Sequence, residues 1–391
     1  MIALAPTAEA ASAAPAARRA ATYVVETSSD WSAVSAGWTG AGTPFQESAW
    51  LGAWYEALGA RAGLTPLLVT ARDAASGEVA VRLPLVLLRE GRRRTIGFAD
   101  LDLTDYNAPA LGPAAPRDAQ GAAALWKAIR KALPRADLVR FAKMPLTLRG
   151  RPNPLALLPN IQPCALNGNV VVTGEDWDGW RRGLEKTVRK ELERSWRVFS
   201  REPETSFEIV TDPERARRIV DAMEHQQETR MREKGASYVL DDPDFARFYR
   251  TLIERSIEGG EVLVSALMAG DEVVASLLGI RDGETYVMIR ISNAAGRWSN
   301  CSPGRLIIER TMAALHAEGY RSFDFSIGNY DYKRRFGVTP TPLVDFTESL
   351  GLAGIPATLR AAAAGGLRRY PELDRKLRGW IGRLRATKIT S

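Results

Sequence analysis

The sequence predicts an α+β fold with two successive units, each a mixed and mainly antiparallel sheet flanked by helices, followed by a basic helical tail. Strand and helix patterns alternate within each unit, an order typical of a sheet covered by helices. A proline-rich stretch from Arg151 to Pro163 marks the connection between the units. The chain has 391 residues, of which 45% are hydrophobic, which is enough for more than one core.

The first unit contains a helix with an apolar face, a run of strands joined by short turns, and a second helix. Turn signals at residues 75–77 and 90–91 divide the strands. The expected elements are a helix at 48–60, strands at 66–71, 79–88 and 93–98, a helix at 121–132 and a strand at 137–141.

The second unit begins with a long helix, 177–199, whose apolar residues recur every three or four positions. Tight-turn signals at Gly270-Asp271 and Asp282-Gly283 predict a three-stranded meander. The expected elements are strands at 206–211, 261–268, 272–280, 284–291 and 322–325, and helices at 213–233, 244–258 and 304–316.

These signals divide the chain into four parts: 1–21, 22–165, 166–348 and 349–391. The first part is rich in Ala and Pro and has no basic segment before its apolar residues, so we expect a disordered lead-in and not a signal peptide. No stretch approaches the roughly 20 apolar residues that a membrane span needs. Two cysteines are too few for a disulfide framework. We therefore expect a cytoplasmic protein.

The cysteine and histidine content argues against a metal site, since Cys164 and Cys301 are far apart and the only histidines are His225 and His316. The net charge is +7, and the segment 359–391 alone carries this excess. A basic charge confined to one end does not indicate a nucleic-acid-binding body.

The basic end also has apolar residues at helical spacing, among them Leu373, Leu377 and Trp380. Such a helix is typical of a contact with an anionic membrane surface. A terminal helix that packs on the body, with its charges in water, gives the same pattern. Both interpretations remain open, and with the first the protein is peripheral at the inner face of the membrane.

Three motifs in the second unit carry a resemblance to a known family: LVSALMAGDEVVASLLGIRDGETYVMIRIS, SNCSPGRLIIERTMAALHAEGY and FDFSIGNYDYKRRFG. They resemble the GNAT domain of the CelD-like acyltransferases, which are related to the Fem peptidoglycan aminoacyltransferases. FQESAWLGAWYEALG and LDLTDYNAPALG, in the first unit, are similar to that family's first half. The resemblance implies tandem GNAT-like domains, a degenerate one at 22–165 and a catalytic one at 166–348.

The resemblance also implies an acyl-thioester donor, acyl-CoA or an acyl carrier protein, whose phosphates need a binding site. A loop that leads into a helix N-terminus offers free N–H groups and the positive end of the helix dipole. The segment 299–305 has this form, with Ser302 before the helix, Gly304 for close approach and Arg305 for charge. The other expected donor-binding residues are Arg290, on the strand before the loop, Ser292, where the loop begins, and Lys333.

The catalytic candidates lie mainly in FDFSIGNYDYKRRFG. Asp324, at the end of a strand, can accept the proton of an attacking amine, and a structural acid fits equally well. Tyr330 and Tyr332 are candidates to protonate the leaving thiolate, while core packing explains at least one of them. His225 is a second candidate base, although a surface histidine is the plainer interpretation. The expected acceptor-binding residues are Asp105, Tyr106, Gln226 and Arg230.

We therefore expect an enzyme that moves an acyl group to an amine or hydroxyl by direct attack in a ternary complex. The acceptor is a small or lipid-linked molecule, such as an envelope polysaccharide precursor or a sphingoid base. Two alternatives stay open: a Fem-like transferase that uses aminoacyl-tRNA, and a non-catalytic module of an exopolysaccharide or cellulose complex.

Overall fold

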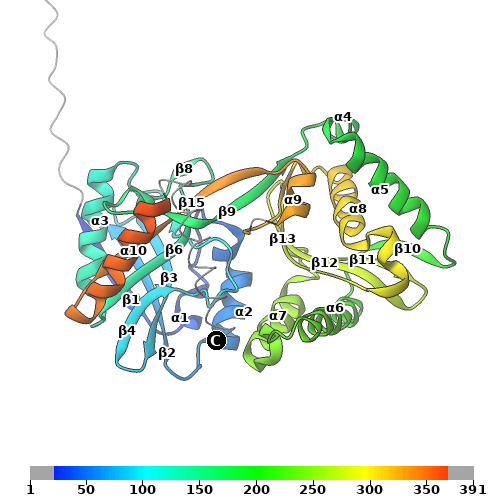
Figure 1. Ribbon diagram of the computed structural model, residues 1–391. Coiled ribbons are helices and arrows are strands. Elements are labelled where there is room, and N and C mark those ends of the chain that lie inside the picture. Colours follow the sequence, from blue (N-terminus) through cyan, green and yellow to red (C-terminus); the bar gives the residue numbers. More distant parts are fainter. Residues whose placement is uncertain (1–21, 329, 369–391) are drawn as a thin grey trace, which may run out of the picture.

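The computed structural model describes residues 22–328 and 330–368, and these residues form an α+β fold with one large mixed sheet flanked by helices. The strand order is β1-β2-β3-β4-β6-β15-β9-β14-β13-β12-β11-β10, with β5 paired to β3 at the side. β4 pairs with β6 and β13 pairs with β14 in parallel, and the other neighbours in this order are antiparallel. Figure 1 shows the two halves of the molecule, with the long strands β9 and β15 running between them.

The strands range from the two residues of β5, β7 and β8 to the twelve of β3. Their bounds are β1 Tyr23–Ser28, β2 Leu64–Asp73, β3 Val79–Glu90, β4 Arg93–Phe98, β5 Ala110–Leu111, β6 Leu138–Pro145, β7 Thr147–Leu148, β8 Arg151–Pro152, β9 Gln162–Val172, β10 Thr205–Val210, β11 Val262–Ala269, β12 Glu272–Asp282, β13 Thr285–Asn293, β14 Ser322–Asp324 and β15 Thr339–Ser349.

The α-helices are α1 Ser32–Ser35, α2 Ser48–Leu58, α3 Ala119–Ala132, α4 Trp177–Gly183, α5 Lys186–Phe199, α6 Pro213–Glu233, α7 Pro243–Ser256, α8 Pro303–Ala317, α9 Asp331–Arg335 and α10 Ile355–Arg368. The 3₁₀ turns are η1 Pro44–Gln46, η2 Pro154–Leu157, η3 Val239–Asp241, η4 Gly296–Cys301 and η5 Leu352–Gly354. No described helix is long and apolar enough to cross a membrane.

The structure has three long strands that the sequence patterns did not predict, β1, β9 and β15, and the short elements α1, β5, β7, β8 and α9 were not predicted either. The helix α10 lies within the predicted helical tail. The predicted lead-in at 1–21 and the residues 369–391 of the predicted tail lie outside the described residues. β9 follows directly on the proline-rich stretch that we interpreted as a connection. β15 carries Pro340 and Pro342, and these prolines made a strand improbable.

The prediction of one helix over 177–199 was wrong, because the chain forms two helices, α4 and α5. Gly183 ends α4, and glycine is a weak helix former. Leu184 then takes an extended conformation, with φ −67° and ψ 154°. The break turns the Leu184 side chain into a core that also contains Phe336. Burial of that leucine is worth more than the one or two helical hydrogen bonds that the break removes.

Strands β10 to β13 have one core on each face, as expected where side chains alternate along a strand. On β11, Val264 and Ala266 face the core beneath α6 and α7. Leu263 and Leu267 face the opposite core, beneath α5 and α8. A third core fills the first half between the sheet and α3. These faces explain the near-continuous apolar runs that the sequence shows here.

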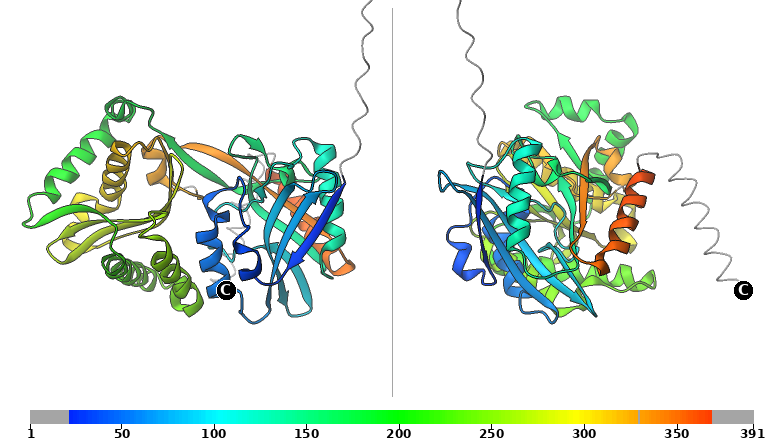
Figure 2. Two further views of the ribbon diagram at one scale, coloured as in Figure 1. Left: turned by 180° about the vertical axis from the view of Figure 1, so that it is seen from behind. Right: turned by 90° about the vertical axis from the view of Figure 1, so that its left-hand side faces the viewer.

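One core spans both halves of the molecule. Trp50 of α2 meets Phe248 of α7 edge to face, with ring centroids 4.8 Å apart. Arg61 adds an ion pair to Asp242 at 2.6 Å. Figure 2 shows from the opposite side that α2 faces the helices of the second half. The halves are therefore joined twice, by the sheet and by this helical contact.

Tyr286 of β13 offers a test of the second core. Its hydroxyl is buried and has no hydrogen-bond partner in the described part of the chain. Burial also raises the pKa of this phenol, so it stays protonated. A buried unpaired hydroxyl destabilises a fold by about 1 kcal/mol or more. We expect Tyr286→Phe to raise the free energy of unfolding by about 1 kcal/mol in denaturant titrations.

Tyr55 supplies the matched control, since it is also buried but its hydroxyl donates to the Leu85 carbonyl at 3.1 Å. Tyr55→Phe should lower stability by about 1 kcal/mol, because the carbonyl loses its partner. Equal effects of the two substitutions would contradict this account of Tyr286.

Candidate active site

The sheet opens into a fork where β13 and β14 part. The two strands pair in parallel from Thr285 to Val287, opposite Ser322 to Asp324. β14 ends at Asp324, while β13 continues to Asn293. Within β13 the register with β12 slips, so that Ile289 is an extra residue between two paired positions. A bulge of this kind turns backbone N–H and C=O groups out of the ladder. The fork therefore has a carboxylate at its base and, along one side, the stretch of β13 that no longer pairs with β14.

Asp324 is held in place by groups from both halves. Its Oδ1 accepts a hydrogen bond from the Tyr106 hydroxyl at 2.8 Å and one from the Ser326 backbone N–H at 2.6 Å. Ser326 has φ +61°, so the chain turns sharply after the strand. The Ser326 hydroxyl donates to Asp105. The structure thus brings together Asp105, Tyr106 and Asp324, which the sequence analysis had assigned to separate halves.

Asn169 of β9 completes this arrangement, and the sequence analysis missed it. Its side-chain amide donates to the Ser326 carbonyl at 2.8 Å and to the Gly328 carbonyl at 3.0 Å. It therefore fixes the loop after β14. Nothing in the sequence indicated that Asn169 belongs to the site, because the strand that carries it was not predicted.

Burial controls the protonation of the carboxyl groups in this cluster. It raises the pKa of Asp324 from 3.8 to about 7, against the smaller opposing effects of the two hydrogen bonds. Burial also raises the pKa of Asp105. A carboxyl with a pKa near 7 exchanges its proton readily at neutral pH, which is what a general base needs.

Lys333 lies beside the same carboxyls. Its Nζ donates to the Ile327 carbonyl at 2.6 Å and to the Ser326 carbonyl at 3.2 Å. Burial lowers the pKa of this lysine from 10.5 to about 8, while Asp105 and Asp324 act in the opposite direction. The ammonium thus offsets part of the negative charge of the cluster. It does not face open solvent, as a simple donor-phosphate contact would.

The two tyrosines of the motif differ in exposure. Tyr330 is 61% exposed, and its ring stacks on that of Tyr332 with centroids 6.0 Å apart. Tyr332 is half-buried, and this burial raises its pKa to about 12. Its hydroxyl therefore keeps its proton throughout the neutral range and can act as a donor.

The predicted residues on α6 and β13 form a separate polar network. Arg290 is buried and donates to the side chain of Gln227 at 2.6 Å and to the Tyr238 hydroxyl at 2.9 Å. Ser292 donates to the side chain of Gln226 at 2.7 Å. These contacts tie α6 to the open side of the fork. Gln227 and Tyr238 were missed, although Gln227 lies next to a predicted residue.

The other two residues predicted on α6 point in different directions. Arg230 donates to the Asn293 side chain at 3.1 Å, at the end of β13. His225 is exposed, and its backbone carbonyl accepts a hydrogen bond from the Thr229 hydroxyl at 2.9 Å. The structure therefore places Arg230 by the fork strand and His225 on the surface of the helix.

The predicted donor loop leads into α8 through Ser302, which has φ +47° and ψ 55°. Its side chain makes no capping bond to the helix. Gly304 lies close to the Asn293 side chain, and a Cβ there would stand 3.0 Å from its Oδ1. Pro303 has no N–H, and the Arg305 N–H donates to the Ser302 carbonyl at 3.0 Å, so the Gly304 N–H is the group of the first turn left for an anion.

Arg305, in contrast, is already paired. Its guanidinium binds both carboxylate oxygens of Glu191 on α5, one of them at 2.8 Å, and also the Ser302 hydroxyl at 2.8 Å. Arg335 adds a further contact to Glu191 at 3.0 Å. Glu191 thus competes with any phosphate for both arginines.

Glu191→Gln is expected to free these two arginines and to tighten binding of a polyphosphate-bearing thioester. For half-exposed ion pairs the gain is about 1 kcal/mol at most, or up to about fivefold in Kd. Titration calorimetry with coenzyme A measures it, and Glu193→Gln, an exposed acid on the same helix, is the control. If Glu191→Gln and Arg305→Gln both leave the Kd unchanged, the loop does not hold the phosphates.

Comparison with known proteins finds a family match over the part of the chain that contains the fork. Residues 186–334 match the family described as "Acetyltransferase (GNAT) domain". The solved structure of FemX shares the fold, with a TM-score of 0.52 and 10% identity over 75% of this chain and 90% of that one. A conserved protein of unknown function from Bacteroides thetaiotaomicron gives 0.47, with 12% identity over 84% and 100% of the two chains. No curated protein sequence matches the chain.

A further similar structure is a tandem GNAT protein from the clavulanic acid biosynthesis pathway. Its TM-score is 0.42, with 13% identity over 84% of this chain and 99% of that one.

Proposed function

We propose that this chain, whose residues 186–334 form an acetyltransferase (GNAT) domain, transfers an acyl group from a thioester to an amine at the fork of β13 and β14. The observation that carries the proposal is Asp324. It lies at the base of the fork, inside the matched region, and its pKa of about 7 suits a base at neutral pH.

The reaction follows from the groups at the fork. The acceptor nitrogen attacks the thioester carbonyl carbon, forming the C–N bond, and its proton passes to the Asp324 carboxylate. Backbone N–H groups at the Ile289 bulge stabilise the negative oxygen of the tetrahedral intermediate. The C–S bond then breaks, and the leaving thiolate takes a proton from the Tyr332 hydroxyl.

Tyr106 is a positioning residue in this scheme. Its hydroxyl donates to Asp324, and burial raises the pKa of this phenol well above 10, so it remains a donor. The first half thereby orients the base of the second half. This contact supports a tandem organisation, in which 22–165 is a GNAT-like helper half and 166–348 the catalytic half.

The donor and the acceptor are part of the proposal. We propose acyl-CoA or an acyl carrier protein as the donor, held at the start of α8, and an amine or hydroxyl of an envelope precursor or amphiphilic lipid as the acceptor. A cytoplasmic enzyme at the inner membrane surface fits such an acceptor, with the contact made by a tail that lies mostly outside the described residues.

Thermal unfolding with coenzyme A, acetyl-CoA and palmitoyl-CoA tests the donor, because a ligand of the native state raises the midpoint by mass action. A saturating donor at about 100 times its Kd adds about 2.7 kcal/mol. We expect an increase with at least one thioester, and release of free thiol only when an amine is also present. If no thioester stabilises the protein, the donor is not an acyl-CoA, and a carrier protein or charged tRNA becomes the donor to test.

A further inference from the structure

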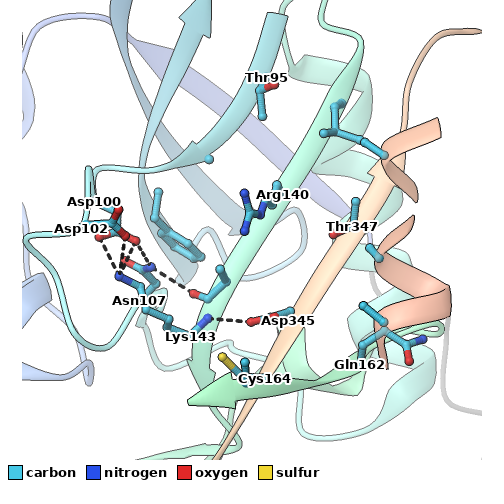
Figure 3. A pocket seen from close by; sticks show the side chains of 18 of the residues that line it. Thr95, Asp100, Asp102, Asn107, Arg140, Lys143, Gln162, Cys164, Asp345 and Thr347 are labelled. Carbon is cyan, nitrogen blue, oxygen red and sulfur yellow. Dashed lines mark hydrogen bonds and ion pairs between the residues drawn. The ribbon is translucent and has the colours of Figure 1, made fainter. Parts of the chain in front are cut away.

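A cavity of about 690 Å³ lies in the first half, outside the matched region. Its floor is the face of β4, β6, β15 and β9, and α10 forms one wall. Figure 3 shows Arg140 and Lys143 on β6, Asp345 and Thr347 on β15, and Gln162 and Cys164 on β9, all around this space. None of the proposed catalytic groups lines it.

The charges around the cavity leave two arginines free. Each acid in the lining has a basic partner: Glu90 pairs with Arg93, Asp100 and Asp102 with Lys143, and Asp345 with Arg368. Arg140 of β6 and Arg360 of α10 also line the cavity, and among the described residues no carboxylate pairs with either. Two guanidinium groups at one cavity are a suitable site for a phosphate or carboxylate.

The rest of the lining mixes aliphatic side chains with uncharged polar ones. α10 contributes three small residues, Ala357, Ala361 and Ala364, which lie one helical turn or so apart on one face. Leucines of β3, β6 and β9 face the same space. The small alanine side chains leave the volume open, and an aliphatic group would bury apolar surface there. The lining as a whole therefore fits an anion attached to an aliphatic body.

β9 connects this cavity to the fork. Gln162, Cys164, Ala165 and Leu166 line the cavity, and β9 continues from Leu166 through Gly168 to Val170. A Cβ at Gly168 would lie 3.2 Å from the Tyr106 ring. The glycine thus leaves room for Tyr106, which binds Asp324. From Leu166 to Val170, the residue paired with Asp324, the strand advances about 13 Å.

We infer that this cavity binds the acceptor of the proposed transfer, an amphiphile with a phosphate or carboxylate head. The identification of the ligand as the acceptor rests on the proposed function, whereas its binding in the cavity does not. Arg140 and Arg360 hold the head, and the aliphatic part packs against the alanines of α10. Arg140 lies opposite Thr347, eight residues along β15 from Thr339, which pairs with the Val170 that faces Asp324. The reactive amine therefore lies about 26 Å from the head when it reaches Asp324.

Titration calorimetry with octyl phosphate, octanoate and inorganic phosphate tests the inference, with the octyl compounds below their micelle concentrations. We expect octyl phosphate or octanoate to bind, and inorganic phosphate to bind at least about tenfold more weakly, because it lacks the aliphatic group. Preference between the two octyl compounds identifies the head as phosphate or carboxylate. No binding by either compound, or equal binding of inorganic phosphate, overturns the inference.

Two pairs of variants locate the binding. Ala361→Trp fills the cavity, whereas Ala362→Trp places the same side chain on the exposed face of α10. Arg140→Gln removes an exposed cation that lines the cavity, whereas Arg217→Gln removes an equally exposed one on α6, away from it. We expect at least a tenfold loss of affinity in the first member of each pair and none in the second. Equal effects within a pair place the binding elsewhere and overturn the inference.

Asp324→Asn separates the two proposals. If it abolishes transfer and leaves octyl phosphate binding unchanged, the cavity and the base act at distinct places, as inferred. If octyl phosphate binds in the cavity but the protein consumes no thioester donor, the proposed transfer is wrong and the proposed binding site is retained. If transfer is observed and Ala361→Trp leaves the KM of the acceptor unchanged, the cavity is not the acceptor site.

Discussion

Asp324→Asn is expected to lower kcat/KM for acyl transfer by at least about 100-fold, the usual contribution of a general base. The asparagine side chain keeps an oxygen that can accept from Tyr106 and Ser326, so the local structure should survive. Steady-state thiol release measures the loss. Asp331→Asn, an exposed acid a few residues on, is the control and should change little. If Asp324→Asn keeps more than about a tenth of the activity, Asp324 is not the base.

A second test is the pH dependence of activity and of stability, measured for the unchanged protein and for Asp324→Asn. A base with a pKa of about 7 must lose its proton to act, so kcat/KM should fall about tenfold per unit below pH 7 and level off above it. The free energy of unfolding should change in the opposite direction and decrease as the pH rises. Between its ordinary pKa of 3.8 and about 7, Asp324 holds a proton in the folded state that the unfolded chain has released, so stability falls as the pH rises through this window. Asp324→Asn cannot ionise, and its melting temperature should fall less from pH 5 to pH 8.

The second large effect concerns the contact between the halves. Trp50 is almost fully buried, packs edge to face on both Phe45 and Phe248, and donates from its indole N–H to Thr104 at 3.2 Å. We expect Trp50→Ala to lower the free energy of unfolding by about 3–5 kcal/mol, as for other large-to-small changes of buried aromatics. Denaturant titration measures the loss.

A second consequence of Trp50→Ala follows from its neighbours. Thr104 lies in the loop that carries Tyr106, and Phe45 packs against the Tyr106 ring at 5.8 Å. Transfer activity should therefore fall even below the unfolding transition. Trp180→Ala, at a half-buried tryptophan of α4, is the control and should lower the free energy of unfolding and the activity much less. Equal losses from the two tryptophans would show that the contact between α2 and α7 does not join the halves.

The sequence predicted the elements from β10 to α8 well because their signals are local. Glycine-containing turns divide β11, β12 and β13, and the N-cap acid Asp212 followed by Pro213 marks the start of α6. The same reasoning found Asp105, Tyr106 and Asp324 separately. It could not show that Tyr106 binds Asp324, because that contact joins residues 218 positions apart.

The missed elements depend on distant contacts. β9 and β15 have prolines and polar residues where a strand pattern should alternate, and they are strands because each fills a place between two others in the sheet. The sequence therefore did not reveal the cavity, whose floor is built from both. The partners of Arg305 were hidden for the same reason, since Glu191 belongs to a helix whose position only the packed structure gives.

β15 has a consequence for how the protein is made. It is among the last described elements to leave the ribosome, yet it pairs with β6 of the first half and with β9. Until it arrives, the nascent first half presents the edge of β6 unpaired, and exposed edges of this kind invite association with other chains. Its pairing with β6 joins residues 138–145 to 343–349 and gives the fold a high contact order, which slows folding. A gene fragment that stops before residue 339 should accordingly yield aggregated protein, even though it encodes every residue of the fork.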